Sequence, residues 1–557
     1  MRLVPITEWL LGYPRNYLRS DVIAGVALAG LLVPEAMGYA GIAGLPPQAG
    51  LYATVFGLLA YAVFGSSRQL VVSPTSASSA ILAATVAPLA ATDPGKFMML
   101  ASAVTLVLGG LFLLAGTLKL GFLSDFISKP VLKGFVFGVA LSIVIKQLPK
   151  LLGIVPGKGH AYQQLWHTLR HGGEANLWSV VVGLAALGVL FALDRRLPRI
   201  PGALVVLVGG IAVSKAFDLH SYGVHIVGAI PPGLPLPGLP VLTWAEWLEA
   251  APAAVGLVMV LFAESMGAAR TFASKNGYEV DANQELRALG LANATSAVFH
   301  GMQVGGGTSG TAANDANGAQ SQVSAIAASA SVALTLLFLT RWFYHLPEAV
   351  LAAIVMHAVW HLLDYKTLQH FHRVSTLEFR ESLAAIFGVL AFDILNGLLL
   401  AVLLTLTALM RFLVMPQVVV LGRLRQTGEF ADIERHPDAE QFPGILILRV
   451  DRIWFFANAN GIRDHAKRLI RQAPAPLHTV ILNLAPVSLL DVTAAEVLAQ
   501  LHASSEKHGR RMVLAGVRDP VRDTMEKAGL IKVYGEENIF RSMAQALAAV
   551  TNPPAAL

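Results

Sequence analysis

The sequence has no cysteine and little charge, and these two absences exclude several classes of protein. Without cysteine there is no disulfide and no thiolate metal site. Only 14% of the 557 residues are charged and 55% are hydrophobic, whereas a soluble domain has roughly 25% charged residues. The composition therefore excludes an ordinary soluble enzyme and indicates a polytopic membrane protein.

Common motifs of catalysis and nucleotide binding are also missing. No G-x-x-x-x-G-K-[ST] sequence occurs, which argues against ATP-driven transport within this chain. No HExxH motif or nucleophile elbow stands out, so we expect no enzyme activity, no metal and no cofactor. The formal net charge of +6 fits basic cytoplasmic loops better than a nucleic-acid partner. The charged start runs into a long apolar span without a cleavage pattern, so no cleavable signal peptide is expected.

The apolar runs predict about fourteen membrane segments, because a span needs about 20 mostly apolar residues. The clear candidates are residues 21–44, 50–65, 97–116, 131–148, 177–194, 201–216, 251–274, 322–340, 347–363 and 379–413. The last run is long enough for two spans, broken near Asn396-Gly397. Weaker segments rich in Gly, Ser or Thr lie at 70–90 and 304–320, with a short span at 284–300. We expect two of these segments to be half-helices.

The basic residues predict how the segments are oriented. Arg2, Arg15 and Arg19 place the N-terminus in the cytoplasm, because cytoplasmic loops carry an excess of Lys and Arg. Even-numbered segments should then end inside, and the predicted inner flanks are basic as required. These flanking residues are Arg68, Lys119, Lys129, Lys133, Arg195, Arg196, Arg199, Arg270, Lys275, Lys366, Arg373 and Arg411. The exceptions, in predicted outer loops, are Lys150, Lys158 and Arg170.

One short phrase occurs twice, in the predicted segments 1 and 8. Residues 32–40 read LVPEAMGYA and residues 261–269 read LFAESMGAA, with Leu, Glu, Met, Gly and Ala at the same spacing. A carboxylate within a membrane is costly, so Glu35 and Glu264 mark an ion or substrate pathway by default. The odd offset between segments 1 and 8 predicts inverted repeats, whose interface forms the site in many secondary transporters.

A second matched pair consists of small and hydroxyl residues in the third segment of each half. Residues 72–79 read VSPTSASS and residues 305–314 read GGGTSGTAAN. If a half-helix begins at each cluster, its N-terminus offers free N–H groups and the positive end of the helix dipole, which favour an anion. The alternative is small residues that only allow close helix packing. Because both clusters accompany the glutamate phrases, a binding site is favoured.

Glu264 is the candidate carrier of a coupling ion. Its span has no nearby cation apart from Arg270 toward the cytoplasmic end, and a carboxyl removed from water can carry a proton at working pH. The alternative is a structural carboxylate paired to a polar helix. Glu35 follows Pro34, which frees backbone groups near the site. His357 and His361, one helical turn apart, are favoured as satisfied or interfacial histidines over a metal site.

After about residue 415 the composition changes to that of a small cytoplasmic α/β domain. The expected strands are 444–451, 479–484 and 511–516, and the helices between them are 459–472, 494–508 and 520–529. The predicted boundaries are a membrane domain at 1–415, with repeats at about 20–216 and 250–414, a linker at 416–441, the α/β domain at 442–550 and a frayed tail at 551–557.

Several phrases of the sequence resemble the SulP (sulfate permease) family of anion transporters, and the resemblance covers nearly the whole chain. The similar phrases are PEAMGYAGIAGLPPQAGLYAT (34–54), FGSSRQLVVSPTSA (64–77), SKPVLKGFVFG (128–138), FASKNGYEVDANQELRALGLANATSAVF (272–299) and LPEAVLAAIV (346–355). The C-terminal part resembles a STAS domain, in FPGILILRVD (442–451), WFFANAN (454–460) and the DVT loop (491–493).

The resemblance implies a polytopic α-helical protein of fourteen segments in two inverted seven-segment repeats, with a core subdomain that moves against a gate subdomain. It implies a homodimer in the bacterial inner membrane, with cytoplasmic STAS domains and substrates such as sulfate, bicarbonate, chloride, oxalate or dicarboxylates. It links Glu264 to proton or sodium coupling. The residues implied to contact the substrate are Glu35, Tyr39, Ser73, Thr75, Ser76, Gly307, Thr308, Ser309 and Gly310.

Two departures from the family pattern bear on the substrate. Many members have Gln where this chain has Glu35, and Arg where it has Gly310. Together they remove a positive charge and add an acid, which favours a monovalent or small anion such as bicarbonate, or a substrate taken up with protons. Sodium coupling stays open, because a carboxylate with carbonyls and hydroxyls also suits a hard cation.

Two further alternatives concern the class of activity and the C-terminal domain. A nucleobase permease of the same fold and a passive channel or exchanger are the competing functions; the STAS-like tail argues against the first and Glu264 against the second. Thr493 falls where related bacterial domains carry a phosphorylatable Ser or Thr, with Asp491 orienting the loop. A role for Thr493 in capping the helix at 494–508 is favoured over a regulatory phosphosite.

Overall fold

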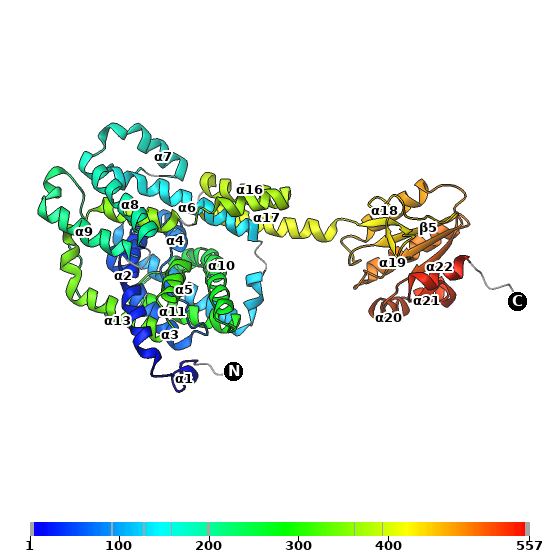
Figure 1. The fold of residues 1–557 in the computed structure, drawn as a ribbon, viewed down its shortest axis with the longest axis horizontal. Coiled ribbons are helices and arrows are strands. Elements are labelled where there is room, and N and C mark those ends of the chain that lie inside the picture. The colour runs from blue at the N-terminus through cyan, green and yellow to red at the C-terminus, as the bar shows by residue number, and fades with distance from the viewer. Residues whose placement is uncertain are drawn as a thin grey trace. The chain divides into compact units, whose positions relative to one another are not determined.

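The computed structural model describes residues 5–90, 93–125, 129–157, 159–197, 201–360, 362–392 and 394–551. The chain divides into two compact units, Met1–Thr405 and Leu406–Leu557, each of which is described by itself (Figure 1). Several predicted features lie outside the described residues, namely Arg2, Lys158, Arg199, His361 and the tail after residue 551.

Each of the fourteen expected segments contains a helix in the structure. The helices are α2 (Tyr17–Ala43), α3 (Pro47–Phe64), α4 (Ser76–Ala90), α5 (Pro94–Thr117), α6 (Lys129–Leu152), α8 (Leu177–Arg196), α9 (Gly202–Ala216), α10 (Trp244–Lys275), α11 (Ala282–Val298), α12 (Thr308–Ala316), α13 (Val323–Leu334), α14 (Glu348–Trp360), α16 (Thr376–Phe392) and α17 (Ile394–Val414). Among the described residues, eight helical stretches are long and apolar enough to cross a membrane. The short α4 and α12 are the expected half-helices.

Local sequence signals account for several helix ends. Asp93 caps α5 by accepting hydrogen bonds from the N–H groups of Gly95 and Lys96. Thr243 and Glu246 form a capping box at the start of α10. No break lies at Asn396-Gly397, because both residues are inside α17, and the described parts of α16 and α17 end and begin at Phe392 and Ile394. Gly397 lies inside α17, where an added Cβ would lie 2.6 Å from Val389 Cα, so this glycine serves close packing and not a break.

The two halves of the first unit meet in a small two-stranded sheet. Strand β1 (Val72–Ser73) precedes α4 and strand β2 (Gly305–Gly306) precedes α12, and the two pair antiparallel with Val72 opposite Gly306. A two-fold axis that exchanges the strands therefore superposes Thr75 on Thr308 and Ser76 on Ser309. The register thus relates the two small-residue clusters as inverted copies, as predicted.

Helix packing follows the same two-fold relation. Helix α13 packs against α2 and α3, and its equivalent α5 packs against α10 and α11. Among the other helices, α16 packs against α6 and α14 packs against α8, which again are exchanged by the symmetry. Small residues allow the close approach: Gly109 of α5 faces the backbone of Ala294 in α11, where an added Cβ would lie 2.8 Å from a backbone nitrogen. This arrangement confirms the predicted seven-plus-seven inverted repeat.

The second unit is an α/β domain around a six-stranded sheet of order β4-β3-β5-β6-β7-β8. Its strands are β3 (Val418–Arg423), β4 (Phe430–Asp432), β5 (Ile445–Val450), β6 (Thr479–Asn483), β7 (Arg511–Ala515) and β8 (Ile539–Phe540). Strands β5 to β8 are parallel, whereas β3 pairs antiparallel with both β4 and β5. Helices α18 (Ala459–Gln472) and α19 (Val492–Glu506) cover one face and α22 (Met543–Thr551) the other.

The expected strands and helices of this domain are present, but the segment expected to be a linker at 416–441 is not a simple connection. It contains β3 and β4, whose apolar residues pair with the sheet. Val418 packs with the α18 face and Leu421 with the α22 face, because side chains alternate along a strand. The three valines at 418–420 are too short a run to predict a strand, because the pattern alone does not distinguish them from the end of the preceding apolar helix.

Candidate functional site

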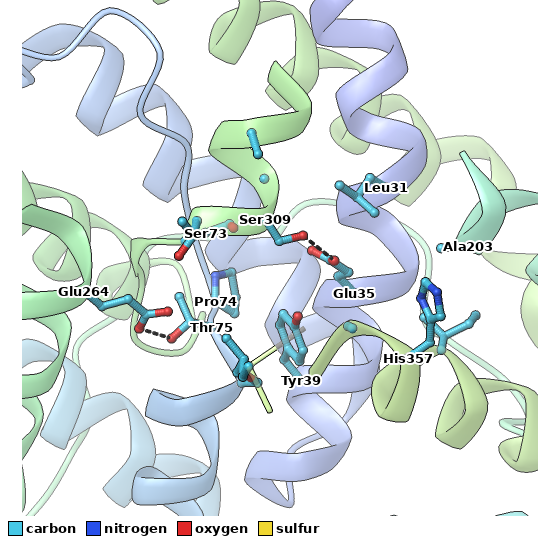
Figure 2. A pocket seen from close by; sticks show the side chains of 18 of the residues that line it. Leu31, Glu35, Tyr39, Ser73, Pro74, Thr75, Ala203, Glu264, Ser309 and His357 are labelled. Atoms are coloured by element: carbon cyan, nitrogen blue, oxygen red, sulfur yellow. Dashed lines mark hydrogen bonds between the residues drawn. The ribbon is translucent and has the colours of Figure 1, made fainter. Parts of the chain in front are cut away.

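The ten predicted site residues line one cavity in the first unit. Its volume is about 710 Å³, and it is formed between the glutamate helices α2 and α10, the starts of α4 and α12, and helices α6, α8, α9 and α14. The predicted residues that line it are Glu35, Tyr39, Ser73, Thr75, Ser76, Glu264, Gly307, Thr308, Ser309 and Gly310. Figure 2 shows Tyr39 between the two glutamates in that view.

The two glutamates each accept a hydrogen bond from a hydroxyl group of the opposite half of the chain. Thr75, before α4, donates from Oγ1 to Glu264 Oε2 of α10 at 3.1 Å, and Ser309 of α12 donates from Oγ to Glu35 Oε1 of α2 at 3.3 Å (Figure 2). The inverted repeat accounts for both hydrogen bonds, because it places the start of each half-helix beside the glutamate helix of the other half. The structure therefore brings the two glutamates into the same cavity.

The starts of the half-helices are fixed by β1 and β2 and by hydroxyl groups of α10 and α12. Ser265 of α10 accepts a hydrogen bond from the Gly306 N–H at 2.7 Å, and Thr311 accepts one from the Val71 N–H at 3.1 Å. These bonds hold the two helix N-termini at the cavity wall. The first N–H groups of a helix have no intrahelical acceptor, so both N-termini present donors and positive partial charge to the cavity.

Two other buried carboxylates of the first unit are fully engaged in hydrogen bonds. Asp21 accepts from the backbone of Gln320 at 2.6 Å, and from the hydroxyls of Ser321 at 2.7 Å and Tyr13 at 2.8 Å. A carboxylate with several donors is stable as a fixed structural group. Asp21 therefore fastens the start of α2 to the loop before α13.

Glu285 of α11 is the second fully engaged carboxylate. It accepts from Tyr61 Oη at 2.7 Å, from Ser66 Oγ at 2.7 Å and from the Ser66 N–H at 2.9 Å. It thus fastens α11 to the loop between α3 and β1. Glu35 and Glu264 differ from these two acids. Each accepts a hydrogen bond from one hydroxyl group, and each lines the cavity.

Three charged or titratable residues of the cavity wall were not predicted as site residues. Lys133 of α6, Asp194 of α8 and His357 of α14 line the cavity opposite the half-helices. His357 Nε2 lies 2.9 Å from Asp194 Oδ2, and its ring packs edge-on against Phe191. Among the described residues no group of His, Cys, Asp and Glu is arranged to hold a metal. The available signal was Asp194, the carboxylate that ends the otherwise apolar span 177–194.

The loop before α19 in the second unit is organised by Asp491. Its carboxylate accepts from the Ala494 N–H at 2.8 Å and from the Phe456 N–H at 2.7 Å, so it caps the helix and joins two loops. Thr493 is half-buried in the first turn of α19. The expectation that Thr493 caps this helix is therefore wrong, because Asp491 is the capping residue, and a phosphosite at Thr493 stays a prediction.

Sequence comparison places this architecture in a known family. The family model described as "Sulfate permease family" matches residues 18–385, and the STAS domain model matches residues 436–546. The chain belongs to the sulfate permease family. Two probable sulfate transporters of Mycobacterium tuberculosis, from strains CDC 1551 and H37Rv, are each 34% identical over 538 residues, covering 96% of both chains. Sulfate transporter 2.2 of Arabidopsis thaliana is 31% identical over 577 residues, covering 98% of this chain and 84% of its own.

Solved structures support the fold over both units. Murine Solute Carrier 26 family member A9, an anion transporter in an inward-facing state, has a TM-score of 0.90 at 23% identity and covers 99% of this chain and 94% of its own. The transmembrane domain of the cyanobacterial bicarbonate transporter BicA has a TM-score of 0.62 at 25% identity, covering 70% of this chain and 98% of its own. The family and these relatives are transporters and not enzymes, so the chain is a multi-pass membrane anion transporter with a STAS domain.

Proposed function

We propose that the protein is a secondary transporter that takes up a small oxyanion together with protons. The anion would bind between the N-termini of α4 and α12 beside a protonated Glu35, and Glu264 would carry the coupling proton. The observation that carries this proposal is that both acids line the same cavity as both half-helix starts, each with one recorded hydroxyl donor.

The charges of the cavity supply the reason for coupling. A bound anion would be attracted by the two helix N-termini and by the hydroxyls of Ser76, Thr308 and Ser309. Ionised Glu35 and Glu264 would repel it, because like charges in a partly desolvated site interact strongly. Protonation of the glutamates removes this repulsion, so anion and proton would bind together and leave together.

The relatives narrow the substrate class. The M. tuberculosis relatives are described as probable sulfate transporters, and BicA is described as a bicarbonate transporter. Both anions are small oxyanions that accept hydrogen bonds from N–H and O–H donors. We therefore take sulfate and bicarbonate as the substrates to test first.

Transport would follow from movement of one group of helices against the other. The core would contain α2, α4, α10 and α12, which hold the anion, and the gate would contain α6, α8, α9 and α14, which form the facing wall. We further propose a homodimer in the bacterial inner membrane, with the N-terminus and the STAS domain in the cytoplasm. The basic flanks at Lys129, Arg195 and Arg270 support this orientation.

Uptake into proteoliposomes tests the proposal. Labelled sulfate, bicarbonate and fumarate are supplied with and without an inward proton gradient, and sodium is varied separately. We expect one oxyanion to accumulate when protons alone are supplied. If no anion accumulates under any gradient, the proposal is wrong and nucleobases become the next substrates to test.

Sodium coupling is the second candidate, because Glu264 and the hydroxyl of Thr75 are oxygen groups of the kind that bind hard cations. Uptake that requires sodium and does not depend on the proton gradient would support sodium coupling over proton coupling.

A further inference from the structure

A second cavity lies on the same helices as the central one, at their other ends. Its volume is about 280 Å³, and it is lined by Gly38 and Gly41 of α2, Gln147 and Lys150 of α6, and Glu348 and Val355 of α14, among others. A neighbouring cavity of about 240 Å³ is lined by the same Lys150 and Glu348, together with His225. We call these two adjoining cavities the Lys150 vestibule.

The vestibule and the central cavity lie at opposite ends of the gate helices. Lys133 of α6 lines the central cavity, and Lys150 lies near the other end of the same helix. At a rise of 1.5 Å per residue, the two lysines are roughly 25 Å apart along the axis, close to the thickness of a membrane core. If the basic start of α6 faces the cytoplasm, the vestibule therefore opens on the outer side.

A contact between α2 and α14 separates the two cavities. Along α2 the central cavity reaches Tyr39 and the vestibule begins at Met37, and along α14 they overlap near Ile354 and Val355. At this level Gly38 lies against Val355: a Cβ added to Gly38 would lie only 2.5 Å from Val355 Cγ2. The two helices thus touch between the linings of the two cavities.

The vestibule holds charges of both signs that are not paired with each other. Lys150 and Glu348 are half-buried and line both of its cavities, and no ion pair joins them in the part of the chain that the structure describes. Lys150 is also one of the few basic residues on the predicted outer side, which is otherwise poor in them. A lysine in a confined, partly dry space concentrates anions, and a carboxylate beside it opposes them.

We propose that Lys150 is the anion-recruiting residue of this vestibule and that the anion passes from it to the central site when Gly38 and Val355 separate. Glu348 limits the attraction, so that the anion is gathered without being trapped. The ligand class is a small inorganic oxyanion, and this inference rests on the proposed function.

The test removes the positive charge of Lys150 in one variant and the negative charge of Glu348 in another. Uptake kinetics of labelled sulfate, or labelled bicarbonate where the wild-type protein moves only that anion, are measured at low and high ionic strength. Lys150→Gln should raise KM about fivefold at low salt, the effect of a unit charge at about 4 Å in water. Glu348→Gln should lower KM, and both effects should shrink at high salt because exposed charges are screened. The maximal rate should change little in either variant.

Two controls separate recruitment from a structural role. Lys150→Arg keeps the charge and should restore the wild-type KM, and Lys215→Gln removes a lysine from α9, on a different apolar cavity, and should leave KM unchanged. Equal KM values for wild type and Lys150→Gln, or KM shifts of the same sign in Lys150→Gln and Glu348→Gln, overturn the proposal.

The side of the vestibule is tested by labelling. The natural chain has no cysteine, so Lys150→Cys introduces a single thiol. A membrane-impermeant thiol reagent added outside intact cells should label it, and labelling only from the cytoplasmic side would overturn the assignment. Absence of any anion transport by the wild-type protein would instead contradict the proposed function, which keeps the two failures distinct.

Discussion

The two halves of the membrane unit have matching sequences but different surroundings at one pair of glycines. Gly38 and Gly267 occupy the same place in the repeated phrase, after Glu35 and Glu264 respectively. At Gly38 an added Cβ would meet Val355, whereas at Gly267 nothing lies within 4 Å. The repeat is therefore symmetric in sequence and asymmetric in packing: the half containing α2 is closed against the gate, and the half containing α10 is open there.

In the proposed transport mechanism, this difference corresponds to one of two alternating states. In an inverted repeat, exchange of the two packings produces the opposite state from the same contacts. The Val-Leu pair at 350–351 of α14 recurs at 131–132 of the equivalent helix α6, which places Val136 at the position of Val355. We therefore expect Gly267 to close against Val136 when Gly38 and Val355 are apart.

The largest effect is expected from a cross-link that fixes the closed half. A Cβ at Gly38 would lie 3.9 Å from Val355 Cβ, and disulfides join Cβ atoms about 3.8 Å apart. The double variant Gly38→Cys with Val355→Cys should form a disulfide on oxidation and lose uptake, and reduction should restore uptake. Mass spectrometry measures the bond and proteoliposome uptake the activity.

Because the chain has no other cysteine, each single cysteine variant is a clean control and should respond to neither treatment. Full uptake by the cross-linked protein would show that the α2–α14 contact does not open during transport. The pair Gly267→Cys with Val136→Cys sharpens the comparison, since it should cross-link only when the protein visits the opposite state.

The next largest effect concerns the glutamate of the open half. Glu264→Gln keeps the shape of the side chain and cannot release a proton, so accumulation against a gradient should be lost while exchange of anion for anion persists. Both are measured in proteoliposomes, with and without an inward proton gradient. Asp21→Asn serves as the comparison for a structural acid, and it should lower thermal stability instead. Unchanged accumulation by Glu264→Gln would remove this residue from the coupling mechanism.

The sequence predicts which positions of the two halves correspond to each other. It does not predict the difference in packing at Gly38 and Gly267. The repeated phrases paired Glu35 with Glu264 and the two small-residue clusters with each other, and repeat symmetry only suggested that both glutamates reach one cavity, which they do in the structure. Lys133 was interpreted as a basic flank, since nothing in a helix sequence says that its end faces a cavity. The asymmetry between Gly38 and Gly267 is invisible in matching phrases, because it belongs to the conformational state.

A moderate effect is expected from a methyl group at each of the two glycines. Gly38→Ala forces its Cβ into Val355, and such overpacking costs about 1–3 kcal/mol. The closed packing should become less populated, so labelling of Lys150→Cys should change in this background. Gly267→Ala enters open space and should leave labelling unchanged. Equal labelling in both backgrounds would mean that the Gly38 contact does not hold the closed state.

The smallest effect is expected from the two hydroxyl donors, and it compares the acids directly. Thr75→Ala and Ser309→Ala each remove the recorded hydroxyl donor of one glutamate, at 3.1 Å from Glu264 and at 3.3 Å from Glu35. A hydrogen bond of this kind contributes about 1 kcal/mol, so each variant should change KM for the transported anion by a few-fold.

The two variants should differ in proton coupling. Thr75 makes the shorter hydrogen bond, and its partner Glu264 is the proposed coupling acid. Thr75→Ala should therefore also weaken the dependence of uptake on the proton gradient. Ser309→Ala should change anion affinity alone, because its partner Glu35 lies on the half that is closed against the gate. Equal loss of gradient dependence in both variants would assign proton coupling to the two glutamates together and remove the functional difference between the halves.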